Sequence, residues 1–170
     1  MSESAEQRFA RLMGEYGTAL ARLAAGYEAD PHEREDLVQD IALAVWMALP
    51  RFRGDCSERT FVYRIAHNRG LTHRARRRSA PEPLAPDGRL ADPGPDPEAE
   101  VAARLRHERL ALAVRGLPGI HRAVVMLTLE GLSNREVAEV LGTTENNVAV
   151  RLTRARKLLR AAMGSLGADQ

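Results

Sequence analysis

Apolar side chains recur every three to four residues along most of this 170-residue chain, with polar side chains between them. That spacing is the period of an amphipathic α-helix, and no alternating stretch is long enough to propose a β-strand. The pattern therefore predicts an all-α fold. The predicted helices cover residues 9–25, 32–49, 97–115 and 118–129, a stretch that begins near residue 57 or 60 and runs to about residue 78, and two further helices between residues 133 and 160.

Residues 81–97 interrupt the helical pattern. Six of the nine prolines lie in this segment, and neither a helix nor a central strand tolerates such a density of Pro and Gly. The segment is also acidic, because residues 81–100 hold six carboxylates against one arginine. We therefore expect a flexible, Pro-rich linker over residues 81–97, which joins a small helical domain of residues 1–80 to a second one of residues 98–165.

The second domain contains a helix, a tight turn and another helix within residues 133–160, SNREVAEVLGTTENNVAVRLTRARKLLR. Ser133 and Glu136 have the spacing of a capping box at the start of the first of these helices. Gly142 supplies the residue that ends it, and either of the next two threonines can cap the following helix. This arrangement predicts a helix-turn-helix.

The last helix of this motif has one narrow apolar stripe and an opposite face of polar and cationic side chains. Five cations and no carboxylate lie between Asn146 and Leu166. A basic helix face is usually just solvated, but the capped preceding helix and the glycine turn favour a helix that enters a DNA major groove. An Asn side chain can hydrogen-bond adenine, an Arg side chain can hydrogen-bond guanine, and Val can contact the methyl group of thymine. The candidate groove-facing residues are Thr144, Asn146, Asn147, Val150, Arg151, Arg154 and Lys157.

Charge is segregated along the chain, although the net charge is only +2. Residues 59–80 hold seven arginines and no carboxylate, which suits the backbone of a nucleic acid. The single cysteine, Cys56, excludes an intrachain disulfide and a cysteine-based zinc cluster. The five histidines stand singly, without carboxylates at ligand spacing, and no phosphate-binding loop or nucleophile motif is present. We expect no metal, no cofactor and no active site.

The longest unbroken apolar run covers residues 41–49, which is nine residues. A membrane-spanning helix needs about 20. The N-terminal segment lacks a cationic start followed by an apolar core, as a secretory signal would have. We therefore expect a cytoplasmic protein with no membrane insertion.

Two motifs in the first domain carry a resemblance to a known family. DLVQD stands before a long apolar helix, and TFVYRIAHN leads into the arginine cluster. Residues 36–78, which contain both motifs, closely resemble region 2 of bacterial sigma factors of the extracytoplasmic-function type. Residues 117–160 are similar to region 4 of the same family. The resemblance implies a sigma factor that binds core RNA polymerase, directs promoter-specific transcription initiation and is not an enzyme; an anti-sigma factor is a further expected partner.

The resemblance assigns polymerase binding to the second predicted helix, which in the family docks on a coiled coil of the largest polymerase subunit. Acidic and amide groups on this helix suit a basic helical partner. The alternative is a solvated first turn whose acids favour the helix dipole. The residues concerned lie on a face away from the apolar stripe, and they are Asp36, Gln39, Asp40 and Leu43.

The resemblance places melted promoter DNA across the third predicted helix, and a flipped base in the loop of residues 53–58. Holding an opened strand needs cations for its backbone and flat groups or pockets for its bases. Phe61, where the family often has Trp, is expected in the core, and Tyr63 faces either DNA or the core. The candidates for minus-ten binding, to duplex and to the melted non-template strand, are Arg53, Asp55, Ser57, Tyr63, Arg64, His67, Asn68, Arg74, Arg76 and Arg77.

Two other functions compete with this interpretation. A stand-alone helix-turn-helix regulator would bind duplex DNA without polymerase, but it leaves the DLVQD helix and the arginine-rich third helix unexplained. A recombinase or nuclease would need a Ser or Tyr nucleophile with arginine partners, or a carboxylate metal cluster. Neither arrangement assembles from the spacings in this sequence.

Overall fold

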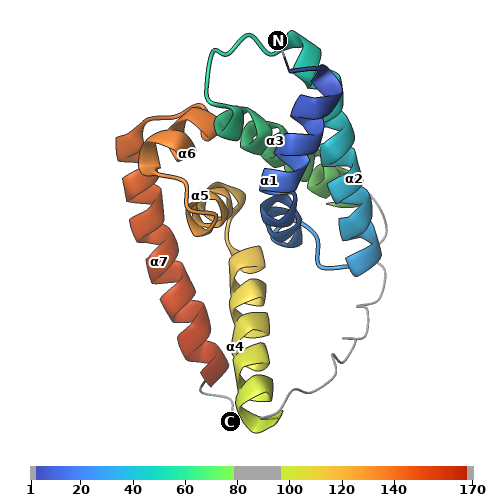
Figure 1. Ribbon diagram of the computed structural model, residues 1–170. Helices are drawn as coiled ribbons and strands as arrows, with labels where there is room; N and C mark the ends of the chain where they lie inside the picture. Colours follow the sequence, from blue (N-terminus) through green and yellow to red (C-terminus); the bar gives the residue numbers. More distant parts are fainter. Residues whose placement is uncertain (1–2, 79–96, 168–170) are drawn as a thin grey trace.

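The computed structural model describes residues 3–78 and 97–167, and over these residues the chain is helical with no strand (Figure 1). The prediction of an all-α fold is confirmed, while residues 81–96 of the expected linker lie outside the described residues. The elements are α1 (Ala5–Ala25), α2 (Pro31–Ala48), the 3-10 turn η1 (Leu49–Arg51), α3 (Glu58–Arg78), α4 (Pro97–Gly116), α5 (Gly119–Leu129), α6 (Asn134–Leu141) and α7 (Glu145–Gly167).

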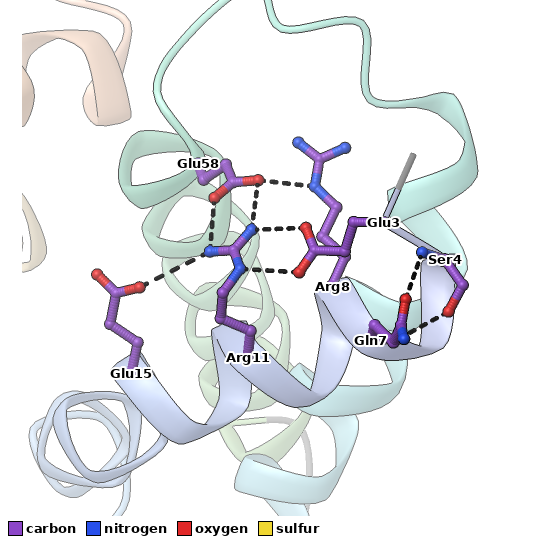
Figure 2. Close-up of polar contacts among 7 residues, drawn as sticks. All are labelled: Glu3, Ser4, Gln7, Arg8, Arg11, Glu15 and Glu58. Atoms are coloured by element: carbon purple, nitrogen blue, oxygen red, sulfur yellow. Dashed lines mark hydrogen bonds and ion pairs between the residues drawn. The ribbon is translucent and has the colours of Figure 1, made fainter. Parts of the chain in front are cut away.

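Helix α1 begins four residues before the predicted start at Phe9, because Ser4 caps it. The Ser4 hydroxyl accepts from the backbone N–H of Gln7, and the Gln7 side chain accepts from the backbone N–H of Ser4 (Figure 2). This is a capping box whose third position is Gln, and it lies before the apolar repeat that the sequence pattern detects. Polar capping therefore extends the helix beyond its hydrophobic stripe.

A cluster of ion pairs joins α1 to the first turn of α3 (Figure 2). The Glu58 carboxylate lies 2.7 Å from Arg8 Nε and 3.0 Å from Arg11 Nη1, and Arg11 also pairs with Glu3 at 3.0 Å. The two arginines, Arg11 first, hold the pKa of Glu58 below its usual value. The pairs are partly exposed, so they orient the two helices more than they stabilise them.

Helices α1, α2 and α3 pack into a bundle around side chains such as Leu12, Ile41 and Val62, each at most 1% exposed. Tyr27, just after α1, closes one end of this bundle. Its ring lies against Gly70 of α3, where a Cβ atom would overlap the ring carbons. Only glycine therefore permits this approach between the ring and the helix.

The C-terminal helices form a second bundle, with α5 at its centre and α4 and α7 running side by side (Figure 1). The predicted helix-turn-helix is confirmed: Ser133 and Glu136 form the capping box, and Gly142 ends α6 with φ 63°. The Thr144 hydroxyl accepts from the backbone N–H of Asn147 at 3.2 Å, so Thr144 is the cap of α7.

The two bundles share one continuous apolar core, because α3 packs against α6 and the α1–α2 turn packs against α5 (Figure 1). The sequence predicts both bundles but not their contact. The arginine-rich helix α3 is consequently covered on one side by its own bundle and on another by the C-terminal bundle.

The close approach at Gly70 predicts a specific loss of stability. Gly70→Ala should reduce the free energy of unfolding by about 1–3 kcal/mol, because the new methyl group displaces the Tyr27 ring. Gly14→Ala, in α1, is the matched control, since a Cβ there meets no atom within 4 Å. Urea unfolding followed by circular dichroism measures both. A Gly70→Ala protein as stable as the Gly14→Ala protein would contradict this packing.

Candidate nucleic-acid and partner interfaces

An open cavity of about 440 Å³ lies between α2, α3 and the segment that joins them. Two aromatic rings, Phe52 and Phe61, form part of its wall with centroids 4.4 Å apart. Arg53 and Asp55, both from the predicted base-capture loop, and Arg64 of α3 also line it. Aromatic rings can stack on an unpaired base, and cationic side chains beside them can contact the nucleic-acid backbone that carries this base. Phe61 is half-buried against the core, as expected, yet it also lines this cavity.

Ser57, another predicted minus-ten residue, has a local structural role. Its hydroxyl accepts from the backbone N–H of Thr60 and lies 3.0 Å from the Thr60 hydroxyl, so it caps the start of α3. Gly54 turns the loop with φ 81°, a conformation that favours glycine. The loop is therefore held by a cap at one end and a left-handed turn in its middle.

Tyr63 and His67, both predicted to contact DNA, are buried in this conformation at 1% and 8% exposed. Tyr63 packs edge-on against Tyr16, and His67 Nδ1 lies 2.6 Å from the Tyr27 hydroxyl. Both side chains point into the bundle with Val62. Of the two orientations open for Tyr63, the structure has the one in the core, and the expectation that His67 faces DNA is corrected for this conformation. Packing against Tyr16 of α1 and against Tyr27 turns the two side chains inward.

The arginine-rich end of α3 also makes contacts within its own bundle. Arg77 pairs with Glu28 at 3.3 Å and with Glu33 at 3.2 Å, and His73 Nε2 lies 2.9 Å from Glu28. Burial favours the neutral form of Glu28, but the backbone N–H of Asp30 together with His73 and Arg77 outweighs burial and lowers its pKa. Of the predicted minus-ten residues, those with exposed side chains are Arg53, Asp55, Ser57, Arg64, Asn68 and Arg76, while Arg74 and Arg77 are half-buried.

The residues predicted to bind polymerase form one exposed face of α2. Asp36, Gln39 and Asp40 are exposed, and Leu43 is 56% exposed. Met47, 66% exposed, extends this face by another turn together with Trp46. Trp46 and Met47 were not among the predicted residues, because both lie in the apolar run of residues 41–49, although both follow Leu43 at helical spacing. The face on α2 is therefore polar at its N-terminal end and apolar at its C-terminal end. Exposed apolar groups gathered in this way are typical of an interaction surface.

Helix α7 presents its polar face outward, as the sequence predicts. Val148, Leu152 and Ala155 are buried at 0–8% exposed and hold the helix on the second bundle. Arg151 is half-buried, and the remaining groove-facing candidates are exposed, namely Thr144, Asn146, Asn147, Val150, Arg154 and Lys157. The hydroxyl of Thr144 is already used as the helix cap.

The described part of the chain holds no group of three His, Cys, Asp or Glu side chains that could bind a metal ion. Within residues 3–78 and 97–167, no helix is long and apolar enough to cross a membrane.

Comparison with known proteins identifies the two bundles. Residues 12–80 match the family described as Sigma-70 region 2, and residues 107–159 match Sigma-70, region 4. The RNA polymerase sigma factor CnrH of Cupriavidus metallidurans is 36% identical over 167 residues, which cover 93% of this chain and 87% of CnrH. The ECF RNA polymerase sigma factor SigM of Mycobacterium tuberculosis is 31% identical over 161 residues, covering 93% of this chain and 78% of SigM.

Two solved structures resemble the whole fold. CnrH in complex with the cytosolic domain of CnrY has a TM-score of 0.71 at 30% identity, covering 94% of this chain and 90% of that one. RpoE in complex with the anti-sigma factor NepR from Bartonella quintana has a TM-score of 0.70 at 19% identity, covering 93% and 98%. The second likeness concerns the fold alone.

The fold and its exposed faces therefore define a DNA-binding protein of two helical sigma regions. The chain belongs to the sigma-70 family of RNA polymerase sigma factors, and its relatives place it in the extracytoplasmic-function type. The resemblance seen in the sequence is confirmed. Sigma factors are not known as catalytic enzymes, so the expectation that this chain is not an enzyme fits the family.

The buried pair of His67 and Tyr27 predicts a pH dependence of stability. Burial lowers the pKa of His67 from 6.5, so the folded state disfavours its charged form. The contribution of neutral His67 to the free energy of unfolding is fully present above the pKa that His67 has in the unfolded state. This contribution is lost as the pH falls below that pKa. We expect the free energy of unfolding, measured in urea at pH 7.5 and at about pH 5, to fall less for His67→Gln than for the wild type. His32→Gln, whose side chain is exposed, should keep the wild-type dependence.

Proposed function

We propose that this sigma factor binds core RNA polymerase through α2, captures and opens promoter DNA with α3 and the loop before it, and reads the upstream element with α7. Residues 1–80 and 98–165 are the two working domains, joined by residues 81–97. The protein acts in the cytoplasm, where polymerase and promoter meet. The polymerase performs the nucleotidyl transfer, and this chain supplies binding contacts.

The observation that carries the proposal is the exposed face of α2. Gln39 and Asp40 offer acceptors to a basic helical partner, and beyond them Leu43 and Met47 offer apolar area that only a partner would cover. A helix-turn-helix regulator working alone has no use for such a face. This observation favours a polymerase subunit over that regulator.

The minus-ten element is proposed to bind at the cavity between α2 and α3. A flipped base would stack on Phe52 and Phe61, and the guanidinium groups of Arg53 and Arg64 would contact the strand that carries it. Arg76, exposed near the end of α3, extends the cationic track. Promoter preference would then depend on the shape of the loop that surrounds this cavity.

The minus-thirty-five element is proposed to bind along α7. Asn146, Asn147 and Val150 lie near the N-terminal end of this helix, where a recognition helix contacts base edges. Arg154 lies one turn beyond Val150 on the same exposed face. An anti-sigma factor is a further proposed partner, since both similar structures contain a sigma factor bound to another protein.

Promoter-specific run-off transcription with core polymerase on genomic fragments tests the proposed function. In a pull-down with core polymerase, the double variant Gln39→Ala with Asp40→Ala should show core association weakened about tenfold, because both residues lie on the exposed α2 face. Helicity should not change. Glu108→Ala, exposed on α4, is the control and should bind core normally. Unchanged core binding by the folded double variant in a pull-down would exclude this face.

Two arginines of α7 should separate base reading from backbone contact. Arg154→Ala should cost about 1–3 kcal/mol and relax preference at one upstream base, because the side chain is expected to reach a base edge. Arg160→Ala, on the flank, should weaken binding to all sequences alike. Selection from a promoter library with each variant measures both effects. If the two variants selected the same unchanged motif, α7 would enter the groove in another orientation.

A further inference from the structure

One side chain of α1 contacts both ends of the loop of residues 53–58. The loop follows Phe52, the C-cap of η1, and it ends at Glu58, the first residue of α3. The guanidinium carbon of Arg8 lies over the Phe52 ring, 4.9 Å from its centroid, and Arg8 Nε donates to the Glu58 carboxylate at 2.7 Å. Arg8 therefore connects the start of the loop to its end.

The position of Arg8 is fixed by the start of α1. The Ser4 capping box closes the first turn of this helix, and the backbone N–H of Arg8 donates to the Ser4 carbonyl at 2.9 Å. The next residue, Phe9, packs edge-on against Trp46 of α2 with the ring centroids 5.3 Å apart. A capped turn that is packed on a neighbouring helix is a rigid support for a long side chain. Arg8 can therefore hold the loop in place.

Glu58 accepts hydrogen bonds from a second arginine of the same helix, as Figure 2 shows. Arg11 Nη1 donates to one Glu58 oxygen at 3.0 Å, and Arg11 Nη2 donates to the other at 3.1 Å. Arg11 is also paired with Glu3 at 3.0 Å. The two arginines share the Glu58 carboxylate, but the guanidinium group over the Phe52 ring is that of Arg8. This difference allows the ring contact to be tested apart from the ion pair.

The Phe52 ring connects Arg8 to the cavity proposed for the flipped base. The residues that line this cavity come from α2, η1, the loop and α3, and Phe52 and Phe61 are among them. Their ring planes are tilted by 38°. A base stacks only on a ring whose face is presented to it, and a cation over a ring favours one orientation of that ring. Arg8 therefore constrains the tilt at which Phe52 stands in the cavity wall.

We propose that Arg8 is a positioning residue for base capture, and that α1 thereby helps to set promoter preference. The Arg8 guanidinium fixes the tilt of Phe52 and the spacing between the two ends of the loop. A flipped base then meets a stacking surface that is already formed. Arg8 acts through Phe52 and does not touch the base. This inference rests on the proposed function, because it takes the cavity as the site of the flipped base.

The expected effect of losing this contact is modest and specific to the base. The side chains of Arg8 and Glu58 are each 29% exposed, and a cation at such a site biases the orientation of a ring about two- to fivefold. When only a fraction of the molecules holds the ring correctly, the apparent dissociation constant rises by the inverse of that fraction. Capture of the base should therefore weaken by this factor, while contacts to the strand backbone persist.

A set of fluorescein-labelled DNA strands separates base capture from backbone binding. One strand is abasic throughout, and the others each carry a single A, C, G or T at the centre of an abasic backbone. Fluorescence anisotropy with the full chain at low ionic strength gives each dissociation constant. The dissociation constant of the abasic strand divided by that of the best-bound single base is here called the base gain. It measures base capture apart from the charge of the strand.

The matched variants are Arg8→Gln and Arg11→Gln. Each removes one positive charge and one partner of Glu58, so both should weaken binding of the abasic strand to a similar extent. Arg8→Gln should also lower the base gain about two- to fivefold, whereas Arg11→Gln should leave the base gain unchanged. Gln is a good helix former, so α1 should remain folded in both variants, and circular dichroism checks this.

A second comparison tests whether Arg8 acts through Phe52. Phe52→Leu removes the ring and should itself lower the base gain, because the base loses a stacking surface. In that background, Arg8→Gln should lower the base gain no further, since the guanidinium has no ring to hold. Losses that add in the double variant would mean that Arg8 acts by another route.

The outcomes distinguish this inference from the proposed function. A base gain lowered by Arg8→Gln, kept by Arg11→Gln and insensitive to Arg8 once Phe52 is replaced supports the positioning role. Equal base gains in the wild type and in both single variants overturn the inference, and so does an equal loss in both or an additive loss with Phe52→Leu. A wild type without any base gain overturns it as well, because the cavity then captures no base. In all these cases, promoter-specific run-off transcription by the wild type would still support a sigma factor, whereas its failure would count against the proposed function.

Discussion

The arrangement of this protein depends on Tyr27, where the two helical bundles meet. The ring lies against Gly70 of α3, its hydroxyl is 2.6 Å from His67, and the guanidinium of Arg122 lies over the ring from the other bundle. Burial raises the pKa of Tyr27 and lowers that of His67, so both remain neutral where the core closes. One aromatic ring thus fixes the end of the first bundle and the docking position of the second.

The same docking decides which of the candidate surfaces are exposed. The α2 face and the outward face of α7 remain exposed, while part of α3 meets the oxygens of α5 and α6. Arginine suits these contacts, because its planar group donates several hydrogen bonds at once to carbonyl and carboxylate oxygens.

Elements with a strong local signal were predictable from the sequence. Asp30 before Pro31 marks the start of α2, and Ser133 with Gly142 marks both ends of α6. These signals depend on side chains that bond their own backbone within a few residues, so no distant contact can change them. The inward stripe of α7 was predictable for a similar reason, since its period is a property of the helix itself. The four-residue error at the start of α1 arose where polar capping, rather than hydrophobic spacing, set the boundary.

By itself, the sequence determined the helical fold, the two regions and the sigma-factor family, because periodicity, caps and motifs are all local in the chain. Only the tertiary structure decided that Tyr63 and His67 face inward and that Met47 faces outward on α2. It alone decided that Arg59 and Arg64 meet oxygens more than 70 residues away along the chain. The reason is physical: which side of a helix becomes buried depends on the partners that pack against it, and those partners come from distant parts of the sequence.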